Sequence, residues 1–221
     1  MRNTTRRLTR YLTAGAVAVG MLATSVIASA APAGATRPVG TKSLASVLAA
    51  DGDTFDHNWY DYDVLTQAVG AVLAAKPNSP VKVLADGTVR LTAFLPSDRA
   101  FQLLAKDLTG TKYRTEAELF SGLAGLLGVD TIESVLLYHV VPGVTIDSKT
   151  ALRSDGVKLT TALSGATITV DVLSKRRRLI KLVDADRDDA DPLVNRWALD
   201  INKGNRQIAH GIWLVLRPLD I

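Results

Sequence analysis

A strand that leads directly into a helix is the feature of this sequence that most restricts its fold. Apolar and other side chains alternate over residues 89–95, as they do in a β-strand, and Pro96 ends the alternation. Ser97 is a residue type that caps helix N-termini, and apolar side chains then recur at helical spacing over residues 98–108. We therefore expect a strand whose end is fixed by the start of a helix.

Helical patterns fill the first half of the chain after residue 42, and strand patterns fill the second half. Helices are expected at 43–48, 64–75 and 98–108, and after the capping-box patterns at Thr115 and Asp130. Strands are expected in a hairpin over 81–95 that turns at Asp86-Gly87, and over 157–163, 166–172, 179–183, 197–201 and 208–216. Helices that cluster before strands predict one domain of the α+β class rather than repeated β-α-β units.

The first 35 residues have the layout of a secretory signal peptide. Four arginines in the first ten residues precede an uncharged stretch and two small-residue cleavage sites, after Ala30 and after Ala35. An uncleaved membrane anchor is the alternative, although the stretch contains as much Ala, Gly, Thr and Ser as Val and Leu. We expect export by the general or the twin-arginine route, without stable membrane insertion after cleavage. A short leader over 36–43 and one folded domain over 44–219 would follow.

The charge balance argues against nucleic acid as a partner. All 22 acidic residues lie beyond residue 35, together with 22 of the 26 lysines and arginines, so the exported chain would carry no net charge. A general preference for nucleic acid or for anionic membranes therefore has no support. The chain has no cysteine, which excludes a disulfide framework.

Patterns of catalytic and metal-binding residues are missing from the sequence. It lacks the nucleophile-elbow, phosphate-loop, dinucleotide-binding and zinc-protease motifs, and its three histidines are widely separated. The acidic run over 184–191 resembles the start of a calcium loop, but Asp189 stands where the sharp turn needs Gly and Asn195 where a bidentate Glu is needed. We expect a protein that is not an enzyme, with no cofactor and no metal, and we expect the acidic run to be a solvated loop.

Two polar segments are candidates for binding. A dense basic cluster lies between two expected strands: Lys175, Arg176, Arg177 and Arg178. It is either a solvated hairpin tip or a contact for an anionic polysaccharide or cell-wall polymer. Trp59 and Tyr60 lie in an acidic loop, where they either pin the loop onto the core or stack a sugar or another ring-shaped ligand.

Tyr138 and His139 form a polar pair inside an apolar segment. Leucines precede the pair and valines follow it, so we expect His139 to be buried and neutral with a hydrogen-bond partner. A surface recognition role for the pair is the alternative.

Three segments resemble motifs of the fasciclin (FAS1) family of extracellular adhesion domains. Residues 91–101 are similar to the family's T-x-F-A-P-T/S-x-x-A-F pattern, and residues 136–143 are similar to its Y-H-V-V-P-G segment. Residues 200–210 resemble its D-I…N-G-x-I-H segment, with Arg206 in place of the usual Gly. Gly211-Ile212-Trp213 then replaces a common V-I-D. The resemblance extends from about Leu44 to Pro218.

This resemblance implies a wedge-shaped β-sandwich with a helical cap. It also implies a secreted or cell-surface adhesion module that binds extracellular matrix, cell-wall polymer or protein partners without catalysis. In animal members, Tyr-His and Asp-Ile segments have been assigned integrin binding, which by position would fall on Tyr138, His139, Asp200 and Ile201. A few members bind small apolar ligands, so an extracellular carrier of a small apolar or aromatic ligand is the alternative function.

Overall fold

The computed structural model describes residues 39–50, 52 and 55–218. The predicted signal peptide, residues 1–35, lies outside the described residues, and the predicted leader and domain end lie partly outside them. The helices are α1 (Leu44–Leu48), α2 (Asp63–Ala75), α3 (Asp98–Thr109), α4 (Glu116–Tyr138) and α5 (Ser148–Ala151), with a 3-10 helix η1 (Pro80–Ala85). The strands are β1 (Leu91–Pro96), β2 (Val140–Pro142), β3 (Lys158–Thr160), β4 (Thr167–Ser174), β5 (Leu179–Val183) and β6 (Gln207–Ile212).

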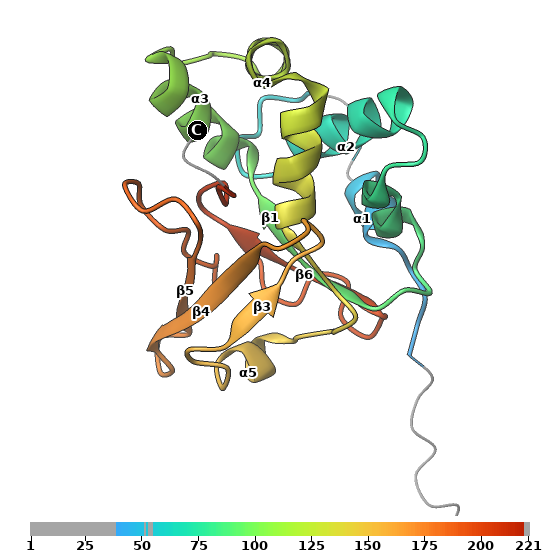
Figure 1. The fold of residues 1–221 in the computed structure, drawn as a ribbon, viewed down its shortest axis with the longest axis vertical. Coiled ribbons are helices and arrows are strands. Elements are labelled where there is room, and N and C mark those ends of the chain that lie inside the picture. The colour runs from blue at the N-terminus through green and yellow to red at the C-terminus, as the bar shows by residue number, and fades with distance from the viewer. Residues whose placement is uncertain (1–38, 51, 53–54, 219–221) are drawn as a thin grey trace, which may run out of the picture. The chain divides into compact units, whose positions relative to one another are not determined.

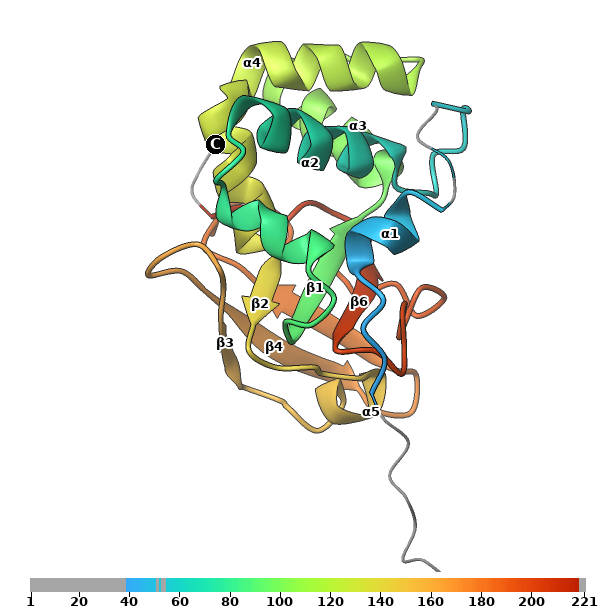
Figure 2. The same cartoon turned by 90° about the vertical axis from the view of Figure 1, so that its right-hand side faces the viewer.

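The strands form two three-stranded sheets. In the first sheet, β1 lies between β2, to which it is antiparallel, and β6, to which it is parallel. The second sheet is antiparallel, with the order β3-β4-β5. Figures 1 and 2 show α2, α3 and α4 on one side of the first sheet and the second sheet on its other side. The described residues thus form the predicted α+β sandwich with a helical cap.

β1 is the strand that both cores share. All six of its residues are buried. Leu91, Ala93 and Leu95 pack into the core beneath the helices, whereas Phe94 packs into the core between the two sheets. Because successive side chains of a strand point to opposite faces, one short strand joins the helical layer to the sandwich.

Side-chain caps fix the predicted helix starts. Ser43 Oγ accepts a hydrogen bond from the Ser46 amide at 3.2 Å, and Thr115 Oγ1 accepts one from the Glu118 amide at 3.2 Å. α3 ends at Gly110, whose φ of 68° suits glycine. α4 consists of two helices that meet at Gly128, whose φ of 70° and ψ of 167° are not helical. The second helix begins close to Asp130, as the capping-box pattern predicts.

In the described part of the chain, α4 is the helix that is long and apolar enough to cross a membrane by length and composition. Its two ends pack into the helical core through Leu119, Leu123, Val135, Leu136 and Leu137. Core helices of soluble proteins pass the same test of length and composition.

Two predicted strands are wrong. Residues 81–85 belong to η1, because Pro80 occupies its first turn and Ser79 Oγ caps the Val81 amide at 3.2 Å. Residues 197–201 are irregular and form one β-bridge, between Ile201 and Ala209, instead of a strand. Asp200 and Asn202 interrupt the extended backbone with left-handed φ values of 58° and 65°. The final strand is also shorter than predicted, as β6 ends at Ile212.

Candidate interaction site

Tyr138 and His139 lie inside the protein. Tyr138 is fully buried, and its hydroxyl donates to the Thr167 carbonyl at 3.0 Å. His139 Nε2 accepts from the Leu216 amide at 3.0 Å, so the proton is on Nδ1, which lies 2.7 Å from the Val135 carbonyl oxygen. Burial lowers the pKa of His139 to about 4. The prediction of a buried, neutral histidine is confirmed, and neither side chain is presented to a partner.

Asp200 and Ile201 belong to the turn that precedes β6. The Asp200 carboxylate accepts from the Ser148 amide at 2.6 Å, from the Ser148 hydroxyl at 2.9 Å and from Lys203 Nζ at 2.8 Å. Burial alone would raise the pKa of Asp200, but the hydrogen bonds from Lys203 and Ser148 outweigh it and lower the pKa to about 2. Ile201 is half-buried against the helical core. The acidic group of this pair is therefore already occupied by hydrogen bonds within the turn.

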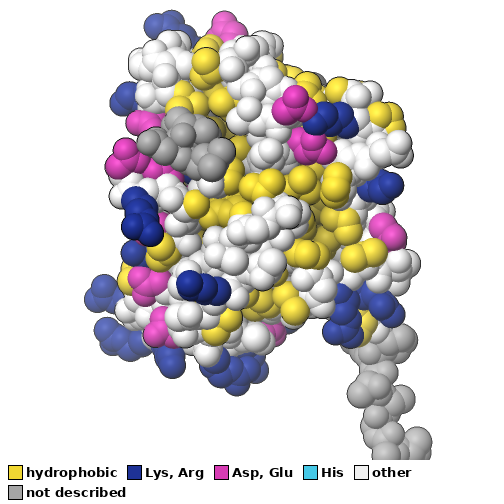
Figure 3. Space-filling view, viewed as in Figure 1, with side chains coloured by type: hydrophobic (Ala, Val, Ile, Leu, Met, Phe, Trp, Pro, Cys, Tyr) yellow, Lys and Arg dark blue, Asp and Glu magenta, His cyan; other side chains and the backbone are white. Residues whose placement is uncertain are grey.

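The basic cluster over residues 175–178, hereafter the basic tip, forms the turn of the β4–β5 hairpin, as predicted. All four residues are exposed. Arg178 Nη2 donates to Ser148 Oγ at 2.8 Å, and Ser148 in turn donates to Asp200, so the structure brings these two predicted sites together. In Figure 3, basic side chains gather at the lower left, where Figure 1 shows the hairpin turning. The basic tip is thus a predicted site that remains open to a partner.

Trp59 and Tyr60, the two aromatic residues of the acidic loop, differ in exposure. Trp59 is half-buried against the helical core, and its carbonyl accepts from the Arg99 amide at 2.8 Å. Tyr60 is 71% exposed. The loop is therefore held down by Trp59, and Tyr60 is the ring that is open to stacking.

Arg217 occupies the place of a cation in the acidic run. Its guanidinium lies 2.6 Å from an Asp107 oxygen, 3.5 Å from one of Asp186 and 3.0 Å from one of Asp189. Arg217 and Asp186 are both buried, so the expectation of a solvated loop is wrong for this part of the run. Burial also raises the pKa of Asp184 to about 7. An internal arginine supplies the positive charge that a calcium ion would supply.

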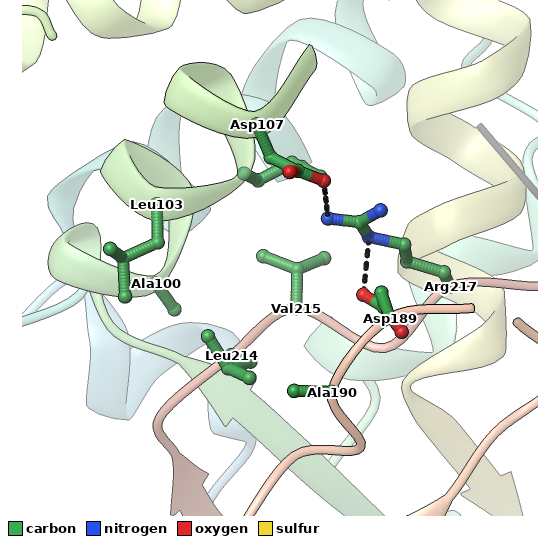
Figure 4. Close-up of a pocket in the computed structure, with 9 residues that line it drawn as sticks. Ala100, Leu103, Asp107, Asp189, Ala190, Leu214, Val215 and Arg217 are labelled. Atoms are coloured by element: carbon green, nitrogen blue, oxygen red, sulfur yellow. Dashed lines mark hydrogen bonds and ion pairs between the residues drawn. The ribbon is translucent and has the colours of Figure 1, made fainter. Parts of the chain in front are cut away.

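A cavity of about 200 Å³ adjoins this ion-pair cluster (Figure 4). Its wall is mostly apolar, with Asp107, Asp189 and Arg217 at one end and the following residues around the rest: Ala100, Leu103, Leu104, Ala190, Leu214 and Val215. The polar groups at its end already pair with one another.

A buried acidic triad lies at the base of the helical layer: Asp61, Asp98 and Glu116. One carboxylate oxygen from each lies within 4.8 Å of the other two. Burial and a hydrogen bond with Asp61 raise the pKa of Asp98 to about 8. The triad was not predicted from the sequence, because its members come from three separate segments. The available signal was an acidic residue in the first turn of a helix at Asp98 and at Glu116.

The family model of the Fasciclin domain matches residues 64–191. A solved structure with similarity to the chain is described as "Novel Fold Revealed by the Structure of a FAS1 Domain Pair from the Insect Cell Adhesion Molecule Fasciclin I". The two are 18% identical with a TM-score of 0.46, and the match covers 69% of this chain and 46% of that chain. No curated protein matches the chain.

Proposed function

The chain belongs to the fasciclin domain family, and we propose that it is a secreted or cell-surface adhesion module that holds an anionic polymer through its basic tip. Fasciclin domains are non-enzymatic modules of the adhesion type and are typically extracellular or on the cell surface. The polymer class that suits the tip is an anionic polysaccharide or an anionic cell-wall polymer, because sulfate, carboxylate and phosphate groups bind lysine and arginine.

The exposure of the basic tip is the observation that carries this proposal. Lys175, Arg176 and Arg177 are exposed and form no ion pair with the described residues. Beyond residue 35 the chain has equal numbers of acidic and basic residues, so the tip is a local positive region on a neutral background. Such a region attracts anionic groups locally, although the chain as a whole carries no net charge.

The other residues predicted to contact a partner are less available than the basic tip. Tyr138 and His139 are buried, and Asp200 is engaged by Ser148 and Lys203, so an integrin-like contact through these residues is not proposed. Carriage of an apolar ligand is the second candidate function. The cavity beside Arg217, at about 200 Å³, is smaller than the roughly 300–1,000 Å³ of typical ligand sites, but a hollow of about 380 Å³ lies against Leu48, Tyr62 and Ile201.

Retention of the purified chain on immobilised heparin and on neutral dextran tests the proposal. The test variant changes Lys175, Arg176 and Arg177 to Ser and keeps Arg178, which bonds Ser148. We expect the wild type to bind heparin at low salt and to elute at high salt, since ions screen exposed charges beyond about 8 Å at physiological ionic strength. The test variant should lose most of its retention, and dextran should retain neither protein.

The matched control removes three exposed basic residues elsewhere: Lys106, Lys112 and Arg114, each changed to Ser. This control should bind heparin almost as the wild type does. Equal loss of binding in both variants would refute a specific role for the tip. Retention that is insensitive to salt and disappears in Tyr60→Ala or Trp59→Ala would instead favour the carrier function.

A further inference from the structure

The acidic triad joins the starts of three helices. Asp61 lies two residues before α2, Asp98 is the first residue of α3, and Glu116 is the first residue of α4. Asp98 is fully buried, Glu116 is 1% exposed and Asp61 is 7% exposed. Helix N-termini attract negative charge, which explains why carboxylates gather there. Three buried carboxylates within 4.8 Å of one another nevertheless repel, and burial of an uncompensated charge is costly.

Two carboxylates of the triad leave one oxygen each without a donor. Asp98 Oδ1 accepts from the Val64 amide at 3.0 Å, and Glu116 Oε2 accepts from the His57 amide at 3.1 Å. Their other oxygens, Asp98 Oδ2 and Glu116 Oε1, are buried and accept no hydrogen bond from an N–H or hydroxyl group of the described residues. The hydrogen bond between Asp98 and Asp61 requires a proton on one of the two carboxylates. Neither residue forms an ion pair with a described residue. Buried acceptors without a donor are rare in folded proteins, and a bound ion is one of the arrangements that satisfies them.

Ser97 adds a further polar atom in the same segment. It immediately precedes Asp98, is 6% exposed, and its hydroxyl has no hydrogen-bond partner among the described residues. Although Ser97 is the N-cap residue of α3, its side chain does not cap the helix. A hydroxyl oxygen is an additional neutral ligand of the kind that hard cations accept.

A proton shared between two carboxylates leaves more of the triad's oxygens without a partner than a bound cation does. One proton joins only two carboxylates, so a proton between Asp61 and Asp98 leaves Glu116 Oε1 without a partner. A divalent cation contacts all three groups at once. Calcium binds oxygen ligands at about 2.3–2.6 Å, so oxygens up to about 5 Å apart can share one ion, whereas magnesium at about 2.0–2.1 Å needs a tighter octahedron. Magnesium usually keeps several waters and takes only one or two carboxylates, so a buried site with three protein carboxylates suits calcium better.

We propose that Asp61, Asp98 and Glu116 form a calcium site that ties together the starts of α2, α3 and α4. The site differs from the acidic run near the C-terminus, where Arg217 supplies the positive charge. Extracellular modules bind calcium with dissociation constants of about 0.1–1 mM, which suits a site with three protein carboxylates. Calcium would therefore stabilise the helical layer without taking part in polymer binding at the basic tip.

Terbium luminescence and thermal unfolding of the purified full chain test this site. After removal of divalent ions with EDTA, Tb³⁺ should give emission sensitised by Tyr62, which lies in the field of Asp61 and Asp98, and calcium should compete it away. Calcium at ten times its dissociation constant should raise the Tm by roughly 3–6 °C. Magnesium at the same concentration should give less than half of this shift, and an equal shift would overturn the assignment to calcium.

Two isosteric variants and one control locate the ion. Asp98→Asn and Glu116→Gln keep an oxygen for the Val64 and His57 amides but remove a charge, so both should fold and lose the response to calcium and terbium. Glu118→Gln removes an exposed carboxylate from the same turn of α4 and should keep the full response. A wild type that does not respond to either ion overturns the proposal, and so does a response that both triad variants retain.

Discussion

His139 ties the end of α4 to the segment after β6, because its two ring nitrogens bond Val135 and Leu216. Only the neutral ring can do this, since the Leu216 amide needs an acceptor at Nε2. A charged imidazole would also be buried without a counter-ion. This explains why burial lowers the pKa of His139 to about 4. The residue acts as a structural cross-link whose strength depends on pH.

His139→Ala should lower the free energy of unfolding by about 1–3 kcal/mol at neutral pH, because it leaves a cavity and two unpaired backbone groups. The pKa is about 4 in the folded chain and 6.5 in the unfolded chain, so the contribution of the neutral ring is complete above pH 6.5. It is lost as the pH falls from 6.5 towards 4. The wild type should therefore lose roughly 2 kcal/mol between about pH 7.5 and pH 5 that the variant does not lose.

Urea unfolding of both proteins at the two pH values measures this difference. Asp98 and Asp184, whose pKa values are raised, destabilise the fold as the pH rises, but they are present in both proteins and cancel in the comparison. The gap between wild type and variant should therefore narrow at pH 5. A gap that stays constant would mean that His139 is not neutral and buried in solution.

At the scale of the elements, Gly211 allows the turn before β6 to lie against that strand. A Cβ atom at this position would meet Ala198 Cβ and the Tyr62 hydroxyl, both at 2.7 Å. The Gly211 amide also donates to the Ala198 carbonyl at 2.8 Å, which fixes the close approach. This contact gives a physical reason for glycine where the family commonly has valine.

Gly211→Ala should destabilise the protein by about 1–3 kcal/mol, because either the turn or the Tyr62 ring must move. Gly70→Ala is the matched control, since Gly70 is exposed in α2 and a Cβ there would meet nothing within 4 Å. It should stabilise the helix by up to about 1 kcal/mol. Thermal unfolding of the two variants measures both effects. A Gly211→Ala variant with an unchanged Tm would show that the turn does not pack closely against β6.

Elements defined by local rules were predictable from the sequence, whereas those defined by distant partners were not. Ser43 and Thr115 cap helices through amides three residues away, so their effect is visible in a short window. Residues 81–85 looked like the first strand of a hairpin. β1 instead pairs with β2 and β6, which lie far along the chain. The pairing of strands that lie far apart in the sequence therefore determines which segments become strands, and local alternation of side chains does not reveal that pairing.

The candidate sites divide in the same way. The basic tip was predictable because four adjacent charges between two strands need no distant information. The burial of His139 was predictable from its apolar neighbours. The acidic triad was not, because its members are 37 and 18 positions apart in order along the sequence and meet only when three helices pack.

At the scale of the whole molecule, the charges beyond residue 35 balance, while the first ten residues hold four arginines and no acid. A basic start, an uncharged stretch and small-residue cleavage sites are typical of a segment that directs export and is then removed, as predicted for residues 1–35. The basic tip and the proposed calcium site both concern the folded part that would remain. Removal of the segment would leave a protein without net charge, in which the basic tip is the densest run of basic residues along the sequence.

We expect the protein in the culture medium of an expressing bacterial host to begin after Ala30 or after Ala35, because small residues precede both positions. Intact-mass measurement of the secreted and membrane fractions distinguishes the two cleavage sites from an uncleaved anchor. Changing the four arginines of the first ten residues to Glu should reduce secretion strongly, since the positive start orients the signal in the membrane. The three-residue Ser control at Lys106, Lys112 and Arg114 alters exposed charge in the folded domain and should be secreted normally. Recovery of the wild type only in membranes, with residues 1–30 still attached, would make it an anchored surface protein, and its basic tip would then act from the membrane rather than in solution.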